Sequence, residues 1–87
     1  KSALNMFTKG LAKELKKNIR VVGIAPSAVN TVFQKKYSSK ARLKKIIKET
    51  PLNRIGLTTE ISELAYFLAG KGASFISGET IFVTGGR

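Results

Sequence analysis

The sequence contains no cysteine, no histidine and no tryptophan, and only five of its 87 residues are acidic. Without cysteine, a disulfide, a thiolate metal site and a cysteine nucleophile are all impossible. Without histidine, the chain also lacks the commonest catalytic base and the commonest metal ligand. These absences exclude zinc enzymes and Ser-His triads, and we expect no metal. The sequence also lacks an apolar secretory segment, which favours a reducing compartment, and we take this to be the cytoplasm.

Long hydrophobic runs are missing as well. The longest, at residues 21–26 and 81–83, fall far short of the ~20 residues that a membrane helix needs. The chain does have a hydrophobic fraction of 43% and a charged fraction of 24%, which are typical of a globular protein. Its length allows one small domain at most. We therefore expect a small folded unit that does not span a membrane.

Apolar residues recur at helical spacing in three parts of the chain, and β-branched residues cluster in two others. The helical spacing predicts helices at residues 3–17, 39–48 and 59–69. Nearly continuous apolar runs predict strands at residues 19–25 and 80–83, covered on both faces. The order of helix, strand, two helices and strand is typical of the α/β class, in which a right-handed crossover joins parallel strands.

Particular residues are expected to mark the ends of these elements. Asn18 tolerates the left-handed conformation that closes a helix, and Pro26 has no N–H for a further strand hydrogen bond. Thr58 is a suitable cap for the last helix, and Glu60 follows in the first turn, where negative charge complements the helix dipole. Arg54 lies in the loop between the last two helices, where we expect a structural role.

Two strands are too few for a sheet of this kind. Apolar parallel strands need helices on both faces and further strands at their edges. The chain supplies about two strands and three helices. We therefore expect it to be one end of a larger α/β sheet protein, or to assemble with other chains.

Four segments follow one another along the chain: KSALNMFTKGLAKEL, IRVVGIAPSAVNT, PLNRIG and ASFISGETIFVTGG. In order and spacing they resemble the carboxyl-terminal part of short-chain dehydrogenases/reductases. In that family a Tyr-x-x-x-Lys helix continues as Lys-(Ala/Ser)-Ala-Leu-Asn, the next strand ends in Pro-Gly-x-(Val/Ile)-x-Thr, and the last strand closes with a Gly-Gly pair. The match covers nearly all of the chain.

The resemblance implies a Rossmann-type doubly wound parallel sheet that binds NAD or NADP at the carboxyl ends of its strands. Residues 1–87 would be the carboxyl-terminal fragment of that domain, with its last two strands and the helices beside them. The glycine-rich turn, the serine and the tyrosine of the family would all lie upstream. We therefore expect the 87-residue segment alone to be inactive.

The resemblance also implies site residues. Lys1 falls on the motif lysine, which lowers the pKa of the tyrosine and hydrogen-bonds the nicotinamide ribose. Pro26, Ser27, Val29 and Thr31 correspond to the loop that receives the nicotinamide. There, main-chain groups at Val29 would pair with the carboxamide, and the Thr31 hydroxyl would reach the carboxamide or a phosphate oxygen. Ser27 stands where the family usually has glycine, a difference that matters if the position needs a positive φ.

Residues 32–50 correspond to the lid over the substrate, which varies within the family. Phe33, Tyr37, Leu43 and Ile46 lie in or beside this lid. These four either contact the substrate or form the apolar side of a short surface helix. The sequence therefore does not identify the substrate.

The lid region is also strongly basic. Seven cations lie within fourteen residues: Lys35, Lys36, Lys40, Arg42, Lys44, Lys45 and Lys48. Such a cluster creates a local positive field that attracts anions. With Tyr37 as the only interleaved aromatic and no recognised reader motif, nucleic acid is disfavoured as the partner. An anionic substrate or an acidic acyl carrier protein remains, and Lys9 and Lys13 could add to the attraction.

Within the family, the resemblance points first to the 3-oxoacyl-(acyl carrier protein) reductases. The predicted function is to form part of an NAD(P)-dependent oxidoreductase that transfers hydride between nicotinamide and a carbonyl or alcohol carbon, in a homo-oligomer. The alternative is a truncated remnant without catalytic activity, which binds acidic partners or serves only in packing and oligomerisation.

Overall fold

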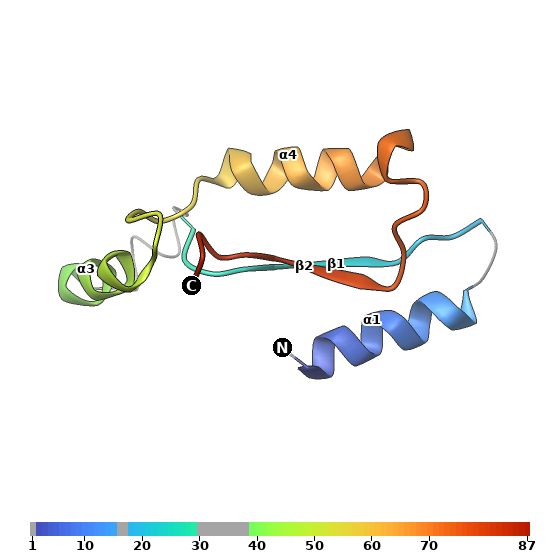
Figure 1. Cartoon of the computed structure of the whole chain (residues 1–87), viewed down its shortest axis with the longest axis horizontal. Coiled ribbons are helices and arrows are strands. Elements are labelled where there is room, and N and C mark those ends of the chain that lie inside the picture. The colour runs from blue at the N-terminus through green and yellow to red at the C-terminus, as the bar shows by residue number, and fades with distance from the viewer. Residues whose placement is uncertain (1, 16–17, 30–38) are drawn as a thin grey trace.

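The computed structural model describes residues 2–15, 18–29 and 39–87 of the chain (Figure 1). The elements follow in the predicted order: α1 (Ser2–Glu14), β1 (Val22–Pro26), α3 (Lys40–Glu49), α4 (Thr58–Ala69), the short 3-10 helix η1 (Lys71–Ala73) and β2 (Glu79–Val83). The α/β class predicted from the periodicity is therefore confirmed.

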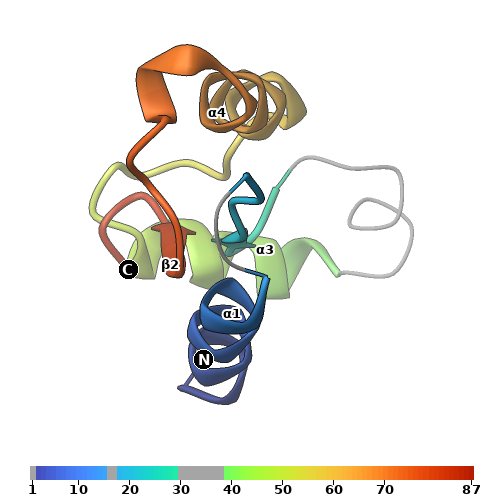
Figure 2. The ribbon, with the colours of Figure 1, turned by 90° about the vertical axis from the view of Figure 1, so that its right-hand side faces the viewer.

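The two strands form a parallel sheet that lies between two helices. Val22 is paired with Glu79 at one end of the ladder and Pro26 with Val83 at the other. α1 packs on one face against both strands, and α4 covers the opposite face (Figures 1 and 2). The chain passes from β1 to β2 through α3 and α4, which is the long connection that parallel strands require. α3 lies beyond the carboxyl ends of the strands, at the end of the molecule where the candidate site is found (Figure 1).

α1 approaches the sheet closely because Gly23, in the middle of β1, has no side chain. A Cβ at this position would lie 3.1 Å from the Oγ1 of Thr80 and 3.3 Å from that of Thr8. Thr8 is buried on the sheet side of α1 and donates its hydroxyl to the carbonyl of Leu4 at 2.9 Å. The close approach of Thr8 to Gly23 therefore holds α1 against the middle of β1, the strand that leads into the candidate site.

β1 begins later than predicted, at Val22 instead of residue 19. The preceding backbone groups bond to the turn before β2. The carbonyl of Val21 accepts the N–H of Gly78 at 2.7 Å, and the N–H of Val21 donates to the Oγ of Ser77 at 3.1 Å. Val21 therefore pairs with the turn that precedes β2, and the regular pairing of β1 with β2 starts one residue later, at Val22. β1 ends at Pro26, one residue later than the predicted end at residue 25.

The helix ends differ from prediction at two points. α1 ends at Glu14, earlier than the predicted end near Asn18, and the N–H of Leu15 still donates to the carbonyl of Leu11 at 2.9 Å. Thr58 was expected to cap α4 but is its first residue, and Leu57 occupies the cap position. The N–H of Leu57 donates to Glu60 Oε1 at 2.8 Å. The carboxylate of Glu60 thus accepts a hydrogen bond from the backbone N–H at the cap position of α4. The Thr58 hydroxyl is not needed as a cap.

α3 begins at Lys40, one residue after the predicted start at residue 39, which is its cap. The Oγ of Ser39 accepts the N–H of Arg42 at 3.1 Å, which is the usual hydrogen bond of an N-cap. At the other end, the Thr50 hydroxyl donates to the carbonyl of Ile46 at 2.7 Å. Both ends of this basic helix are therefore closed by side chains of the chain itself.

Very little of the described apolar surface is buried. Leu68 and Ala73 are the only buried hydrophobic residues in the described ranges, and no large side chain there is completely buried. Phe75 is 101% exposed, Tyr66 85% and Met6 73%. A sheet of two strands cannot cover such side chains by itself.

Candidate active site

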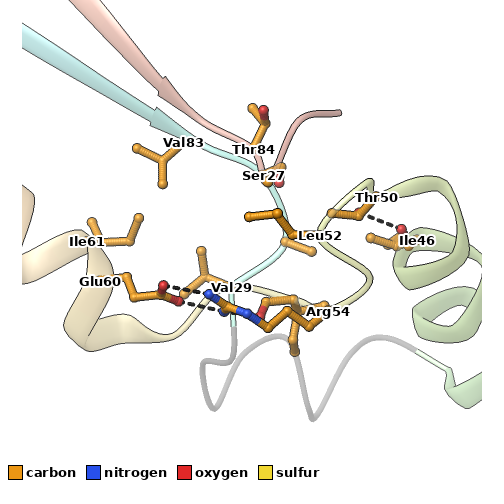
Figure 3. Close-up of a pocket in the computed structure, with 14 residues that line it drawn as sticks. Ser27, Val29, Ile46, Thr50, Leu52, Arg54, Glu60, Ile61, Val83 and Thr84 are labelled. Carbon is orange, nitrogen blue, oxygen red and sulfur yellow. Dashed lines mark hydrogen bonds and ion pairs between the residues drawn. The ribbon is translucent and has the colours of Figure 1, made fainter.

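Three segments meet at the carboxyl ends of β1 and β2. They are the strand-end loop (residues 27–29), the residues after β2 (84–85) and the connecting loop between α3 and α4 (51–57). Together with α3 and α4 they enclose a hollow of about 90 Å³ (Figure 3). Ile61 of α4 and Val83 of β2 extend toward each other on one side of it (Figure 3). A pocket for a whole drug-sized ligand holds roughly 300–1,000 Å³, so this hollow is too small to enclose such a ligand.

The strand-end loop is held in place by backbone hydrogen bonds on both sides. The N–H of Ser27 donates to the carbonyl of Val83 at 3.0 Å, which extends the ladder by one step. The N–H of Gly56 donates to the carbonyl of Ala28 at 3.0 Å, and Val29 and Gly56 form a parallel bridge. Backbone bonds of this kind do not depend on particular side chains. The loop can therefore present its own main-chain groups in a fixed orientation.

Serine at position 27 is compatible with this loop. Among the described residues, Asn53 is the only non-glycine with a positive φ, at 59°, so Ser27 does not adopt the left-handed conformation. Asparagine is one of the residues that tolerate that conformation. The difference from the glycine usual in the family therefore causes no backbone strain at Ser27.

A second, more open groove of about 430 Å³ lies on the α1 side of the strand ends. It is lined by Leu4 of α1, by Ala25, Pro26 and Ser27, and by Thr84 and Arg87. Leu4 lies in the first turn of α1, three residues after Lys1. The first turn of α1 and the strand-end loop therefore line the same groove.

A bidentate ion pair holds the connecting loop to the start of α4. Arg54 Nη1 lies 2.7 Å from Glu60 Oε1, and Arg54 Nη2 lies 2.8 Å from Glu60 Oε2 (Figure 3). Arg54 Nη1 also donates to the carbonyl of Ile55 at 3.2 Å. Because Gly56 follows in the same loop and bonds the strand-end loop, the pair helps to fix the hollow. The structural role predicted for Arg54 is confirmed.

The same ion pair shifts the protonation of Glu60. Hydrogen bonds from Arg54 and then from the N–H of Leu57 lower the pKa of the Glu60 carboxyl from 4.5 to about 2. A carboxyl whose pKa is depressed on folding stabilises the folded state above its unfolded pKa. That contribution is lost as the pH falls from about 4.5 toward about 2.

Glu60→Gln is therefore expected to destabilise the full-length protein at neutral pH, and its difference from the native protein should shrink toward pH 2. Melting temperatures of both proteins across this range would measure the effect. Glu63→Gln is the control, because Glu63 lies in the same helix and forms no ion pair within the described ranges. A Glu60→Gln difference that stayed constant with pH would contradict the assignment.

The structure describes three of the five residues that the resemblance assigns to the site. Pro26, Ser27 and Val29 come together at the strand ends. Lys1 and Thr31 lie outside the described residues, as do Phe33 and Tyr37 of the lid. Ile46 lines the hollow. Within the described ranges, no three carboxylate side chains are grouped closely enough to hold a metal ion. None of the helices there has both the length and the hydrophobicity that a membrane span requires.

The sequence analysis missed the residues that follow β2. Thr84 lies beside Ser27 in both hollows, and Gly85 lines the smaller one. A signal was available, because the carboxyl ends of parallel strands meet at the same edge of a sheet. Applied to the second strand, this rule identifies Thr84 directly.

A parallel sheet with helices on both faces, whose loops meet at the carboxyl ends of the strands, defines the Rossmann-type class of α/β proteins. A sequence model of the family described as enoyl-(acyl carrier protein) reductase matches residues 1–87. The chain belongs to the short-chain dehydrogenase/reductase family.

Named relatives and solved structures agree with this assignment. The chain is 39% identical to 3-oxoacyl-[acyl-carrier-protein] reductase of Chlamydia trachomatis, over 99% of this chain and 35% of that protein. It is 40% identical to short-chain dehydrogenase/reductase SDRA of Arabidopsis thaliana, over 99% of this chain and 34% of that protein. The structure of 7 alpha-hydroxysteroid dehydrogenase complexed with NADH and 7-oxo glycochenodeoxycholic acid matches with a TM-score of 0.90 and 36% identity, over 98% of this chain and 34% of that one. The chain thus spans about a third of the length of these proteins.

Proposed function

We propose that residues 1–87 form part of an NAD(P)-dependent oxidoreductase, which transfers hydride between nicotinamide and a carbonyl or alcohol carbon. The observation that carries the proposal is the strand-end loop, fixed by Val83 and Gly56 and adjoining the groove that Leu4 lines. Family membership and a related structure complexed with NADH support it.

In this proposal the chain is the carboxyl-terminal part of a Rossmann-type domain, and residues 32–50 belong to its substrate lid. The exposed Phe75 and Tyr66, the small size of the hollow and the third of the relatives' length that the chain spans all support this. The remaining strands and the rest of the dinucleotide site would come from other residues of the full-length protein. Assembly into a homo-oligomer would cover further apolar surface.

The strand-end loop suits the nicotinamide end of the cofactor. Gly56 bonds the carbonyl of Ala28 from its side of the parallel bridge, so the N–H and C=O of Val29 point to the other side of the loop. These main-chain groups would hold the carboxamide, and the Thr31 hydroxyl would add a bond to the carboxamide or a phosphate oxygen. When bound, the nicotinamide would supply or accept the hydride.

Lys1 would support proton transfer. A cation next to a phenol stabilises the phenolate and lowers its pKa toward the working pH. In the family's motif, the phenol belongs to a tyrosine four residues before the lysine. Lys1 would also hydrogen-bond the nicotinamide ribose, so that one side chain positions the cofactor and tunes the acid.

The substrate that we propose first is a 3-oxoacyl thioester carried by acyl carrier protein. The similarity to the Chlamydia trachomatis protein with that named activity supports it, as does the excess of cations near the lid. Reduction would convert the 3-oxo group into a 3-hydroxyl, with hydride from the cofactor and a proton from the tyrosine.

The full-length protein is expected to oxidise NADH or NADPH in the presence of acetoacetyl-coenzyme A, a soluble 3-oxoacyl thioester. The absorbance of the reduced nicotinamide would follow the reaction, and calorimetry would measure binding of each cofactor. Cofactor binding without turnover of acetoacetyl-coenzyme A would support the cofactor site and contradict the proposed substrate. Failure to bind either cofactor would contradict the proposed function and favour a remnant without catalytic activity.

A further inference from the structure

α3 carries five basic side chains in ten residues: Lys40, Arg42, Lys44, Lys45 and Lys48. Its only acidic residue, Glu49, is paired with another cation, because Glu49 Oε2 lies 3.2 Å from Arg87 Nη2. None of the five forms an ion pair with a residue that the structure describes. The positive charge of this helix is therefore not neutralised by the described parts of its own fold.

Part of this charge borders a groove. An open depression of about 390 Å³ lies between α3 and the end of the described chain, lined by Arg42, Lys45, Ile46, Glu49 and Arg87. Three of these side chains are cations and one is a carboxylate, which leaves two net positive charges. Arg42, Lys45 and Glu49 are spaced three and four residues apart, so they lie on one face of α3.

The groove adjoins the candidate active site. Ile46 lines both the basic groove and the hollow at the strand ends, so one side chain separates the two. Arg87 likewise lines both the basic groove and the larger groove beside Pro26 and Ser27. An extended ligand whose reacting end lies at the strand ends can therefore reach the cations.

We propose that this groove binds the anionic group of the substrate, a phosphate or a carboxylate remote from the reacting carbonyl. The inference rests on the proposed function and deepens it, because it names a chemical requirement of the substrate. The planar guanidinium groups of Arg42 and Arg87 can bind such oxyanions in a bidentate manner, and Lys45 adds a point charge. Glu49 orients Arg87 through their ion pair.

The groove favours an oxyanion over a nucleic acid. The sequence of α3, KARLKKIIKE, contains no aromatic residue on which a base could stack. The basic groove is local, whereas single-stranded nucleic acid is bound along an extended groove with aromatic platforms. A single phosphate or a short phosphate chain matches its two net charges.

The test compares two substrates that share a reacting 3-oxo group in the full-length protein. Acetoacetyl-coenzyme A carries phosphates, and ethyl acetoacetate is neutral. Arg42→Gln with Lys45→Gln removes two cations from the groove. We expect the ratio of kcat/KM for the anionic over the neutral substrate to fall about tenfold or more, because charge-assisted hydrogen bonds are lost.

Lys44→Gln with Lys48→Gln is the matched control. It removes the same charge from the same helix without touching the lining of the groove. We expect this variant to keep the ratio within about twofold, since exposed charges are largely screened by salt. If the kcat/KM ratio fell equally in the two double variants, the effect would come from the overall positive charge of α3 and the proposed binding groove would be wrong.

A binding measurement separates failure of the groove from failure of the proposed function. Inorganic pyrophosphate should raise the melting temperature of the full-length protein and of the Lys44→Gln/Lys48→Gln control, but not that of Arg42→Gln/Lys45→Gln. This readout needs no turnover, so it still tests the groove if neither substrate is reduced. Equal shifts in all three proteins would overturn the groove.

The source of the anion is tested separately. A low KM for acetoacetyl-coenzyme A that rises in the groove variant would indicate a phosphate on a small molecule. A low KM only for the acetoacetyl thioester of acyl carrier protein, also raised in the groove variant, would indicate an anion supplied by a carrier. An unchanged ratio in Arg42→Gln/Lys45→Gln with both thioesters would contradict the inference.

Discussion

Lys1→Ala in the full-length protein is expected to lower kcat by about 10²–10⁴-fold, the usual contribution of a positioned acid or base. The alanine would no longer stabilise the phenolate of the motif tyrosine, so the pKa of that tyrosine would rise toward its unperturbed value. It would also remove a hydrogen bond to the nicotinamide ribose, and KM for the cofactor should increase. Steady-state kinetics with each cofactor would measure both effects.

The pH profile distinguishes this role from a structural one. A loss of phenolate stabilisation should move the pH dependence of kcat to higher pH, whereas a folding defect would lower kcat at every pH alike. Lys13→Ala is the control, because Lys13 is exposed on α1 and forms no ion pair within the described ranges. Full activity of the Lys1→Ala protein would contradict the proposed catalytic role of Lys1.

The second large effect is expected at Gly85, just beyond β2. Its φ is +64°, and a Cβ there would lie only 2.7 Å from Thr50 Cγ2. A residue with a side chain loses about 1–2 kcal/mol in the left-handed conformation, and overpacking adds about 1–3 kcal/mol. Gly85→Ala should therefore destabilise the full-length protein by about 2–5 kcal/mol, measured as the free energy of unfolding in urea.

Two further variants separate the causes of this loss. Thr50→Ser removes the methyl group that meets the new Cβ, so in combination with Gly85→Ala it should recover the packing part and leave the conformational part. Gly10→Ala is the contrasting control, because a Cβ at Gly10 has no neighbour within 4 Å and the residue lies inside α1. It should stabilise the protein by about 0.5–1 kcal/mol. A Gly85→Ala protein as stable as the native one would show that the contact between the residues after β2 and α3 is loose.

Local sequence patterns predicted the elements of this fold because each pattern depends on neighbours a few residues away. The stripe of Ile61, Leu64 and Leu68 has the helical period and forms α4, and Ser39 caps α3 as its hydroxyl allows. The ends were less predictable, since they depend on partners distant in sequence. Val21 is outside β1 because its backbone bonds to Ser77 and Gly78.

The candidate site was predictable where one loop supplies it. Pro26, Ser27 and Val29 follow directly from the strand that leads into them, and the family resemblance assigned them to the cofactor. The role of Gly56 was not predictable in the same way. Nothing in the local sequence indicates that its N–H meets the carbonyl of Ala28, because the crossover through α3 separates the two.

By itself, the sequence determined the α/β class, the family and the excess of positive charge, because periodicity, motif spacing and composition are properties of the chain alone. Only the tertiary structure decided which loops share the hollow and which cations line the basic groove. Arg87 meets Glu49 across 38 residues of sequence, and Gly85 meets Thr50 beside it. Such contacts depend on the parallel register of β1 and β2, which brings the ends of distant segments to one edge of the sheet.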